Sequence, residues 1–296
     1  MNKTQQNTTL GIWLMVAVTF IFAVQDGISR HLAGEYNVYM IIMIRFWFFA
    51  AFVVTFATRK AGGLRNAART HAPGLQLFRS VLLATEILVA VAGFVLLGLV
   101  ESHAVFAAYP LMIAALSGPV LGEKVGWRRW VAIGVGFLGV LVILEPGFGV
   151  FRAEALIPAL AALMFAVYGL LTRKVANWDS SAVSFFWTGV VGAVVTTAIG
   201  IFHWEPMVGT DWIWMALLCV TSSFSHFLLI KAYEVAEASA IQPLAYLQLV
   251  FASTIGIVVF NETLRPNVAV GAAIVVSAGL FTLWRAHVAN RRALRG

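Results

Sequence analysis

Charged residues are scarce in this 296-residue sequence. Only 11% of its residues are Asp, Glu, Lys or Arg, whereas a soluble domain carries about 25%. Hydrophobic residues make up 61% of the chain, and the mean hydropathy is +0.89. A soluble core of this length cannot cover so much apolar surface. The composition therefore excludes an ordinary soluble protein and indicates a chain that lies in a lipid bilayer.

Cysteine and the common catalytic signatures are almost absent. The single cysteine, Cys219, excludes an intramolecular disulfide and a cysteine-based metal cluster. The sequence contains no Walker-type phosphate loop, no His-Glu-x-x-His and no Gly-x-Ser-x-Gly. These absences argue against ATP hydrolysis within the chain and against an intramembrane protease or lipase. We therefore expect no enzyme activity, no cofactor and no metal site.

Long apolar runs account for most of the chain. Backbone polar groups in lipid must bond internally, so only helices and closed barrels can span it. The runs are continuous rather than alternating and about 20 residues long, as spanning helices require. We predict an all-α polytopic membrane protein with spans at roughly 9–32, 37–58, 73–98, 101–121, 128–145, 151–173, 180–202, 209–233, 237–260 and 266–285. The first run lacks a cleavage site, so we expect a span rather than a signal peptide.

The basic residues indicate the orientation of these spans. A net charge of +7 would suggest nucleic acid in a soluble protein, but here the basic residues lie in short connections. With the N-terminus in the cytoplasm, fifteen of the 20 Lys and Arg residues fall in inside segments, and only Arg30, Arg152 and Arg265 fall in outside segments. The positive-inside rule thus predicts that both termini are cytoplasmic, with no nucleic-acid partner.

Two stretches of the sequence look alike. Each has a glutamate, an apolar run, a second glutamate and then a helix rich in small residues: Glu101 with Glu123, and Glu237 with Glu262. Chance similarity between apolar helices is the alternative. If the repeat is real, it pairs the fourth and fifth spans with the ninth and tenth. Because this offset of five is odd, the halves 1–147 and 148–296 must be inverted, as in many transporters.

These motifs resemble the repeated EamA-type unit of the drug/metabolite transporter superfamily. Leu121-Gly-Glu123 and Phe260-Asn-Glu262 match the ends of its helices, although Asn261 stands where the family commonly has Gly. The stretches from Ile241 to Phe251 and from Leu77 to Leu83 match its ninth and third helices, so the resemblance covers the whole chain. It is strongest to bacterial aromatic amino-acid exporters of the YddG type, and implies amino-acid efflux across the inner membrane.

Polar residues inside a span are costly and need a partner or a function. Arg79 and Glu86 lie two turns apart on one face of the third span. Arg79 could attract a substrate carboxylate, and Glu86 an ammonium group or a proton. Alternatively, both make fixed bonds to neighbouring helices. His103, at the outer start of the fourth span, is a candidate for titration near neutral pH or a structural residue.

The first two spans offer further charged candidates. Asp26 and Arg30 lie four residues apart, which predicts a pair along one helix or a gate at the outer mouth. Arg45, in the second span, is a candidate structural partner for Asp26 or Glu86. The sequence does not choose between them.

The eighth and ninth spans carry the remaining polar candidates. Ser223 and His226 belong to a polar cluster that is expected to face a shared cavity, although serines also allow close helix packing. Gln242 and Tyr246 share a face beside Pro243, and Tyr109 precedes a proline in the fourth span. Interrupted helices with polar side chains line transporter sites, so we predict that these residues line the cavity.

Aromatic residues make up 13% of the chain. Most tryptophans lie near predicted helix ends, as in an interfacial belt. Trp13, Tyr168 and Trp187 lie deeper and are candidates to stack on an aromatic substrate. Packing against lipid or neighbouring helices is the alternative.

We predict from these observations an inner-membrane exporter of small amphiphilic metabolites, most simply aromatic and other neutral amino acids. It would work by alternating access around a central cavity. Its partners would be the small-molecule substrate and the lipid bilayer, and a monomer would be sufficient. A multidrug or nucleotide-sugar transporter of the same fold is the alternative, and an intramembrane enzyme is the remote one. The substrate, and the choice between proton coupling and facilitated diffusion, stay open.

Overall fold

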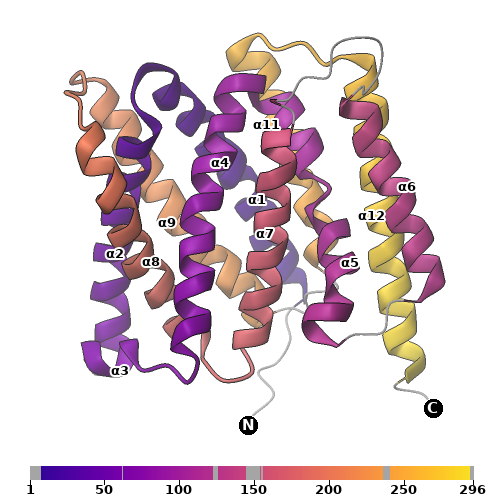
Figure 1. Cartoon of the computed structure of the whole chain (residues 1–296), viewed down its shortest axis with the longest axis horizontal. Helices are drawn as coiled ribbons and strands as arrows, with labels where there is room; N and C mark the ends of the chain where they lie inside the picture. Colours follow the sequence, from indigo (N-terminus) through magenta and orange to yellow (C-terminus); the bar gives the residue numbers. More distant parts are fainter. Residues whose placement is uncertain are drawn as a thin grey trace.

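The computed structural model describes residues 8–61, 63–122, 126–144, 154, 156–235 and 241–293. Every regular element within these ranges is a helix (Figure 1). The elements are α1 (Thr8–Glu35), α2 (Val38–Ala61), α3 (Leu64–Ala68), α4 (Pro73–Phe106), α5 (Tyr109–Leu121), α6 (Trp127–Leu144), α7 (Leu156–Val175), α8 (Ser181–Gly200), η2 (Ile201–His203), α9 (Asp211–Val235), η3 (Gln242–Tyr246), α11 (Leu247–Phe260) and α12 (Pro266–Ala293).

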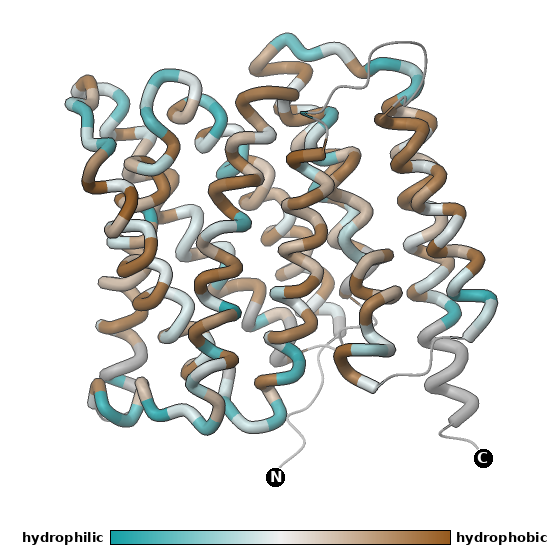
Figure 2. The backbone as a smooth tube through the Cα atoms, viewed as in Figure 1, coloured by the Kyte–Doolittle hydropathy of each residue, from teal (hydrophilic) through white to brown (hydrophobic). Residues whose placement is uncertain are grey.

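Eight of the described helices are long and apolar enough to cross a membrane, namely α1, α2, α4, α6, α7, α8, α9 and α12. Two further apolar segments, Tyr109–Leu121 and Leu244–Phe260, are shorter. Hydrophilic residues gather at the two ends of the bundle, and hydrophobic residues fill its middle (Figure 2). The prediction of an all-helical, multi-pass membrane protein is confirmed.

The predicted fourth span is interrupted rather than continuous. Helix α4 runs on to Phe106 but bends at Gly98, where φ is 83° and ψ is 173°. The helical conformation is interrupted again at Ala107 and Ala108, before α5 begins. Pro110 lies in the first turn of α5 and has no N–H to continue the preceding helix. The predicted boundary at residue 98 therefore coincides with a kink inside one long element.

The predicted ninth span is interrupted at a comparable place. A 3₁₀ segment, η3, contains Pro243 and leads directly into α11. The ends of α5 and α11 also agree, because Gly122 (φ 75°) and Asn261 (φ 54°) both adopt the left-handed conformation that closes a helix. Asparagine tolerates this conformation better than other side chains, which explains why it can replace the usual glycine.

The main helix contacts pair α1 with α9, α4 with α7, α2 with α8 and α6 with α12. Small residues let the last pair approach closely, since a Cβ on Gly139 would lie 2.9 Å from the carbonyl oxygen of Gly271. Helix α1 begins, and α12 ends, at the same end of the bundle (Figure 1). We call this the terminal end, and the opposite one the far end.

Candidate functional site: a polar cavity in the bundle

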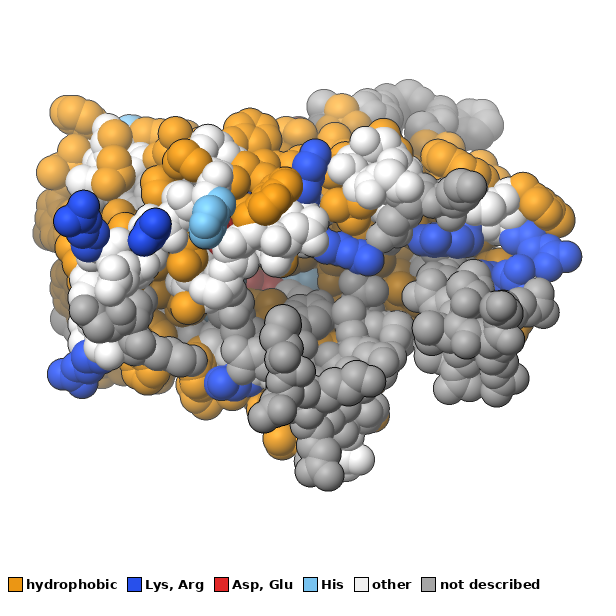
Figure 3. Space-filling view, turned by 90° about the horizontal axis from the view of Figure 1, so that it is seen from below, with side chains coloured by type: hydrophobic (Ala, Val, Ile, Leu, Met, Phe, Trp, Pro, Cys, Tyr) orange, Lys and Arg blue, Asp and Glu red, His pale blue; other side chains and the backbone are white. Residues whose placement is uncertain are grey.

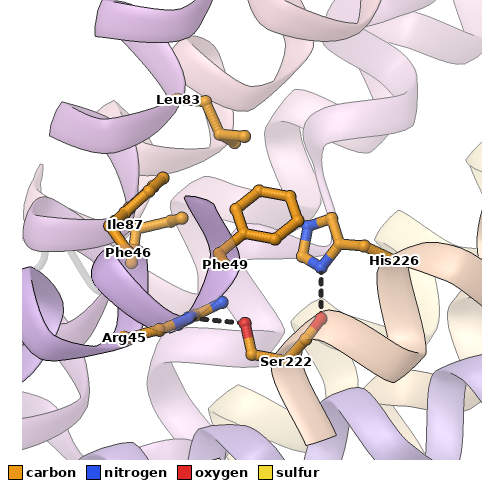
Figure 4. Close-up of a pocket in the computed structure, with 7 residues that line it drawn as sticks. All are labelled: Arg45, Phe46, Phe49, Leu83, Ile87, Ser222 and His226. Carbon is orange, nitrogen blue, oxygen red and sulfur yellow. Dashed lines mark hydrogen bonds between the residues drawn. The ribbon is translucent and has the colours of Figure 1, made fainter. Parts of the chain in front are cut away.

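A small cavity lies between three helices of the bundle (Figure 4). It is lined by residues of α2, α4 and α9, which are Arg45, Phe46, Phe49, Leu83, Ile87, Ser222 and His226. Its volume is about 10 Å³, about the space of one water molecule. Typical small-molecule sites hold about 300–1,000 Å³. A substrate would therefore enter only if the surrounding helices separate.

Arg45 is the cationic group of this cavity. It is 5% exposed, and its Nε donates to Ser222 Oγ at 2.7 Å. Among the described residues its guanidinium makes no other hydrogen bond, so both terminal nitrogens lack a protein acceptor. Paired N–H donors of this kind match a carboxylate. In the sequence, Arg45 is marked only as an arginine within an apolar span, which predicts a structural partner for Asp26 or Glu86 rather than a cavity residue.

Aromatic rings form one wall of the same cavity. The ring of Phe49 lies 5.8 Å from that of His226 and 6.1 Å from that of Phe46. Ser222 fixes the orientation of His226, because its carbonyl lies 2.8 Å from the imidazole Nδ1. A flat, apolar group would therefore find stacking surfaces beside a cationic one.

Asp26, on α1, joins three helices deeper in the bundle. Its Oδ2 lies 3.0 Å from His103 Nε2 on α4 and accepts a hydrogen bond of 3.0 Å from Gln248 Nε2 on α11. Asp26 and Arg30 do not pair along α1 as the sequence suggested, because Arg30 forms an ion pair with Glu262 instead. In a packed bundle, partners across helices replace the neighbour one turn away.

Glu86 completes the buried charges of this region. It is 4% exposed, and no hydrogen bond to it is present among the described residues. Its charge interacts with those of Asp26 and Arg45. Its neighbours on α4, Leu83 and Ile87, line the cavity.

In the described part of the chain, no group of three or more His, Cys, Asp or Glu residues is arranged to hold a metal ion.

The Glu262 network joins α1 and α4 to the end of α11 at the far end of the bundle. The Glu262 carboxylate accepts from the backbone N–H of Leu99 (2.9 Å) and Val100 (2.8 Å), which the kink at Gly98 leaves without helical partners. It also pairs with Arg30. The helix N-terminus and the arginine both favour an anion here. A second ion pair, Arg265–Glu101 at 2.8 Å, lies at the same end.

The terminal end looks different. Seen from this end, acidic and histidine side chains are visible at the floor of a recess between the helices (Figure 3). At the far end, two ion pairs join the two halves of the chain, and Figure 3 shows a recess between the described helices at the terminal end.

Comparison with known proteins identifies the architecture. The profile of the EamA-like transporter family matches the chain twice, over residues 9–145 and 153–284. The chain belongs to the EamA-like transporter family. Within the drug/metabolite transporter superfamily, this EamA protein is a multi-pass small-molecule transporter made of two tandem units, as its repeated glutamate motifs predicted.

Curated relatives of this EamA protein match it along nearly its full length. The S-adenosylmethionine uptake transporter of Rickettsia prowazekii (strain Madrid E) is 27% identical over 285 residues, covering 96% of each chain. The riboflavin transporter of Vibrio cholerae serotype O1 is 27% identical over 290 residues, covering 95% of each chain. A solved structure shares the fold with a TM-score of 0.64 at 16% identity, covering 95% of this chain and 98% of that one.

Three of the residues predicted to line the cavity lie on its wall or beside it. His226 lies on its wall, and Glu86 and His103 belong to the buried charged region beside it. Ser223 is 3% exposed on α9, and its hydroxyl has no partner among the described residues. The side chain of Gln242 lies outside the described residues.

Four aromatic candidates lie away from this cavity. Tyr246 packs against α12, where its hydroxyl fills the space beside Gly279. Tyr109 packs on Phe165, with ring centroids 5.0 Å apart. Trp187 Nε1 donates to the carbonyl of Ala68 at 3.0 Å, and Trp13 is 68% exposed on the outside of the bundle.

Arg79 makes fixed bonds instead of facing open space. The guanidinium is 1% exposed and donates to neutral oxygens only. Its partners are the side chains of Gln76 (2.9 Å), Thr188 (2.9 Å), Tyr168 (3.1 Å) and Thr172 (3.2 Å) and the carbonyl of Ser184 (2.6 Å). Arg79 and Tyr168 thus hold α4 against α7 and α8, which supports the structural interpretation offered by the sequence.

Asp179 anchors this region in the loop between α7 and α8. Burial opposes its charge, but hydrogen bonds from the His71 backbone N–H and from the Thr70 and Gln76 side chains outweigh burial and lower the pKa of Asp179. A lowered folded-state pKa gives stability that is present above the ordinary carboxyl pKa and is lost as pH falls through the folded value.

We expect Asp179→Asn to lower the melting temperature at pH 7, because the charged hydrogen bonds of Asp179 are weakened. The difference from wild type should shrink as pH falls below about 4, the ordinary carboxyl pKa. Thermal unfolding in detergent at several pH values measures this, with the exposed Glu35→Gln as control. A difference that does not vary with pH would contradict the assignment.

Proposed function

We propose that this protein transports small zwitterionic metabolites that join an α-amino-carboxylate head to a flat ring. The observation that carries the proposal is Arg45, whose two terminal nitrogens have no described protein acceptor in a cavity walled by Phe46, Phe49 and His226. The arginine would hold the carboxylate, and the rings would hold the flat group. Aromatic amino acids and S-adenosylmethionine both belong to this class.

The relatives favour S-adenosylmethionine as the first compound to test, because the uptake transporter of Rickettsia prowazekii matches 96% of the chain. The cavity of about 10 Å³ is smaller than any of these compounds. Binding of an amino acid or of S-adenosylmethionine therefore requires the surrounding helices to separate. Riboflavin is the second candidate, favoured by the Vibrio cholerae relative and by the aromatic wall. The direction of transport, which the sequence suggested to be export, is part of the test.

We further propose ten spans arranged as two inverted five-helix halves. The helix contacts support this arrangement, because exchanging the halves converts the α1–α9 pair into α4–α7 and the α1–α11 pair into α5–α7. The pairs α2–α8 and α6–α12 convert into themselves. The two short apolar segments, each interrupted near a proline, occupy equivalent positions as the fourth and ninth spans.

The orientation that we propose places both termini in the cytoplasm of a bacterial inner membrane. It follows from the fifteen-to-three distribution of Lys and Arg. In this orientation the recess at the terminal end faces the cytoplasm, and the Glu262 network closes the outside (Figures 1 and 3). The structure then corresponds to the inward-facing state of alternating access.

Reconstitution in liposomes tests the function. We expect saturable flux of labelled S-adenosylmethionine or phenylalanine, measured in both directions, that empty liposomes lack. Methionine and threonine carry the α-amino-carboxylate head but no ring, whereas riboflavin carries a flat ring but no such head. Their fluxes show which of the two groups the protein requires. If riboflavin alone is transported, the substrate class is a neutral flat molecule and not a zwitterion. No flux of any of these compounds would overturn the proposed class.

A further inference from the structure

Hydrogen bonds around His103 require a proton that a neutral imidazole does not have. The ring is 3% exposed. Its Nε2 lies 3.0 Å from Asp26 Oδ2, and its Nδ1 lies 3.0 Å from the carbonyl oxygen of Leu99. A carbonyl oxygen and a carboxylate are both acceptors, whereas a neutral imidazole has one N–H. Both contacts are hydrogen bonds only if the His103–Asp26 pair holds one additional proton, on either residue.

The surroundings keep this pair in place. Phe94 stacks on the imidazole, with ring centroids 5.0 Å apart and planes 9° from parallel. Gln248 donates to the same Asp26 oxygen at 3.0 Å and carries no charge of its own. Arg45 attracts the charge of Asp26 from α2 but forms no hydrogen bond with it among the described residues. The additional proton makes the His103–Asp26 pair itself neutral, which lowers the cost of burying it in a membrane.

Other ionisable groups border the pair on several helices. These are Arg30 one turn away on α1, Arg45 on α2, Glu86 on α4, His226 on α9 and Glu262 after α11. Arg30 and Glu262 form an ion pair, and Arg45 interacts electrostatically with both Asp26 and Glu86. The His103–Asp26 pair is thus the one in this set whose hydrogen bonds themselves depend on a proton.

The pair is connected to closure of the far end. His103 binds the carbonyl of Leu99, and Glu262 binds the N–H of the same residue. The contacts of Asp26 with His103 and Gln248 join α1 to α4 and α11. Arg30, one turn further along the same face of α1, pairs with Glu262 at the end of α11. The proton-dependent contacts and the Glu262 network therefore link the same three helices. When the proton leaves, one of the two His103 contacts is lost, and this end is held less firmly.

We propose that the His103–Asp26 pair is a proton-binding site whose occupation favours the closed far end, so that transport by this protein is linked to H⁺. The proposal rests on the alternating-access cycle of the proposed function but not on the substrate. In the cycle, one proton binds to the pair as the far end closes and returns to solvent when it opens. No other atom is transferred.

Labelling of a buried cysteine tests the proposal without any substrate. The reporter is Ser29→Cys in a Cys219→Ser background, because Ser29 is 0% exposed on the face of α1 that carries Asp26 and Arg30. In liposomes, reaction with a membrane-impermeant maleimide measures opening of the far end, after correction for thiolate formation with a model thiol. We expect labelling to slow about tenfold between pH 8 and pH 5.5, since a charged hydrogen bond is gained.

Two variants remove the site in different ways. His103→Gln removes the imidazole ring, and Asp26→Asn keeps a hydrogen-bonding group that needs no additional proton. Both should make labelling independent of pH. The control is His203→Gln, because His203 is exposed and has one carbonyl contact, at 3.0 Å to Ile199. If either site variant fails to fold, the other still decides.

Proton movement is the second readout. With a substrate found in the flux assay, a pH-sensitive dye inside the liposomes should report H⁺ flux that depends on substrate and is lost in Asp26→Asn. Labelling that is independent of pH in the reporter protein, or that keeps its pH dependence in both variants, would overturn the proposal. Failure to find any substrate would overturn the proposed function and leave the labelling result intact.

Discussion

Arg45→Ala is expected to reduce transport of a zwitterionic substrate at low concentration by about 100-fold. The guanidinium is 5% exposed, and its terminal nitrogens have no described protein acceptor. Two charge-assisted hydrogen bonds to a carboxylate, each worth about 1.5 kcal/mol or more, account for this factor. Initial flux of labelled S-adenosylmethionine or phenylalanine into liposomes measures the loss.

Substrate analogues separate carboxylate recognition from general damage to the protein. The decarboxylated forms, decarboxylated S-adenosylmethionine and phenylethylamine, should be transported poorly by wild type and equally poorly by Arg45→Ala. Arg45→Lys keeps the charge but loses the paired donors, so we expect an intermediate rate. Arg285→Ala is the matched control, because Arg285 lies near the end of α12 against Trp284, outside the cavity. A rate for Arg45→Ala within threefold of wild type would exclude Arg45 as a ligand.

Glu262→Ala is expected to open the far end of the bundle. The carboxylate binds two backbone N–H groups and Arg30, and the Arg30 and Glu262 side chains are 20% and 12% exposed. Removing it leaves these groups unpaired, which should cost the closed state about 2–4 kcal/mol. Labelling of the Ser29→Cys reporter should rise, and flux should fall because the inward-facing state becomes rare.

Gly98→Ala offers an independent way to disturb the same contact. Gly98 has a φ of 83°, and an added Cβ would lie 2.7 Å from Glu262 Cδ. We expect the same increase in labelling without any change in charge. Glu35→Ala removes an exposed carboxylate at the same end of the bundle and is the control. Unchanged labelling in both Glu262→Ala and Gly98→Ala would show that this network does not control closure.

Partner choice shows where prediction from the sequence ended. Asp26 and Arg30 have the spacing of a helical pair, yet one binds His103 and Gln248 and the other binds Glu262. These partners lie more than seventy residues away along the chain. Arg79 was ambiguous for the same reason, because the sequence contained no information on the oxygens that α7 and α8 bring to it.

The cavity itself could not be located from the sequence. Helix α2 is apolar around its whole circumference, as spans in lipid can be, so no polar face shows which side of Arg45 looks inward. Aromatic residues were equally ambiguous. Trp13 lies on the outside and Phe49 on the cavity wall, although both are aromatic residues within apolar runs.

What the sequence determined by itself was the solvent and the family. Apolar runs of spanning length can be stable only as helices in lipid, and duplicated Gly-Glu and Asn-Glu motifs identify the tandem EamA units. The tertiary structure decided which polar groups meet. Hydrophobicity drives each helix into the bilayer but does not orient it there. Helix rotation is set by close packing and by hydrogen bonds between helices, and these depend on residues far apart in the chain.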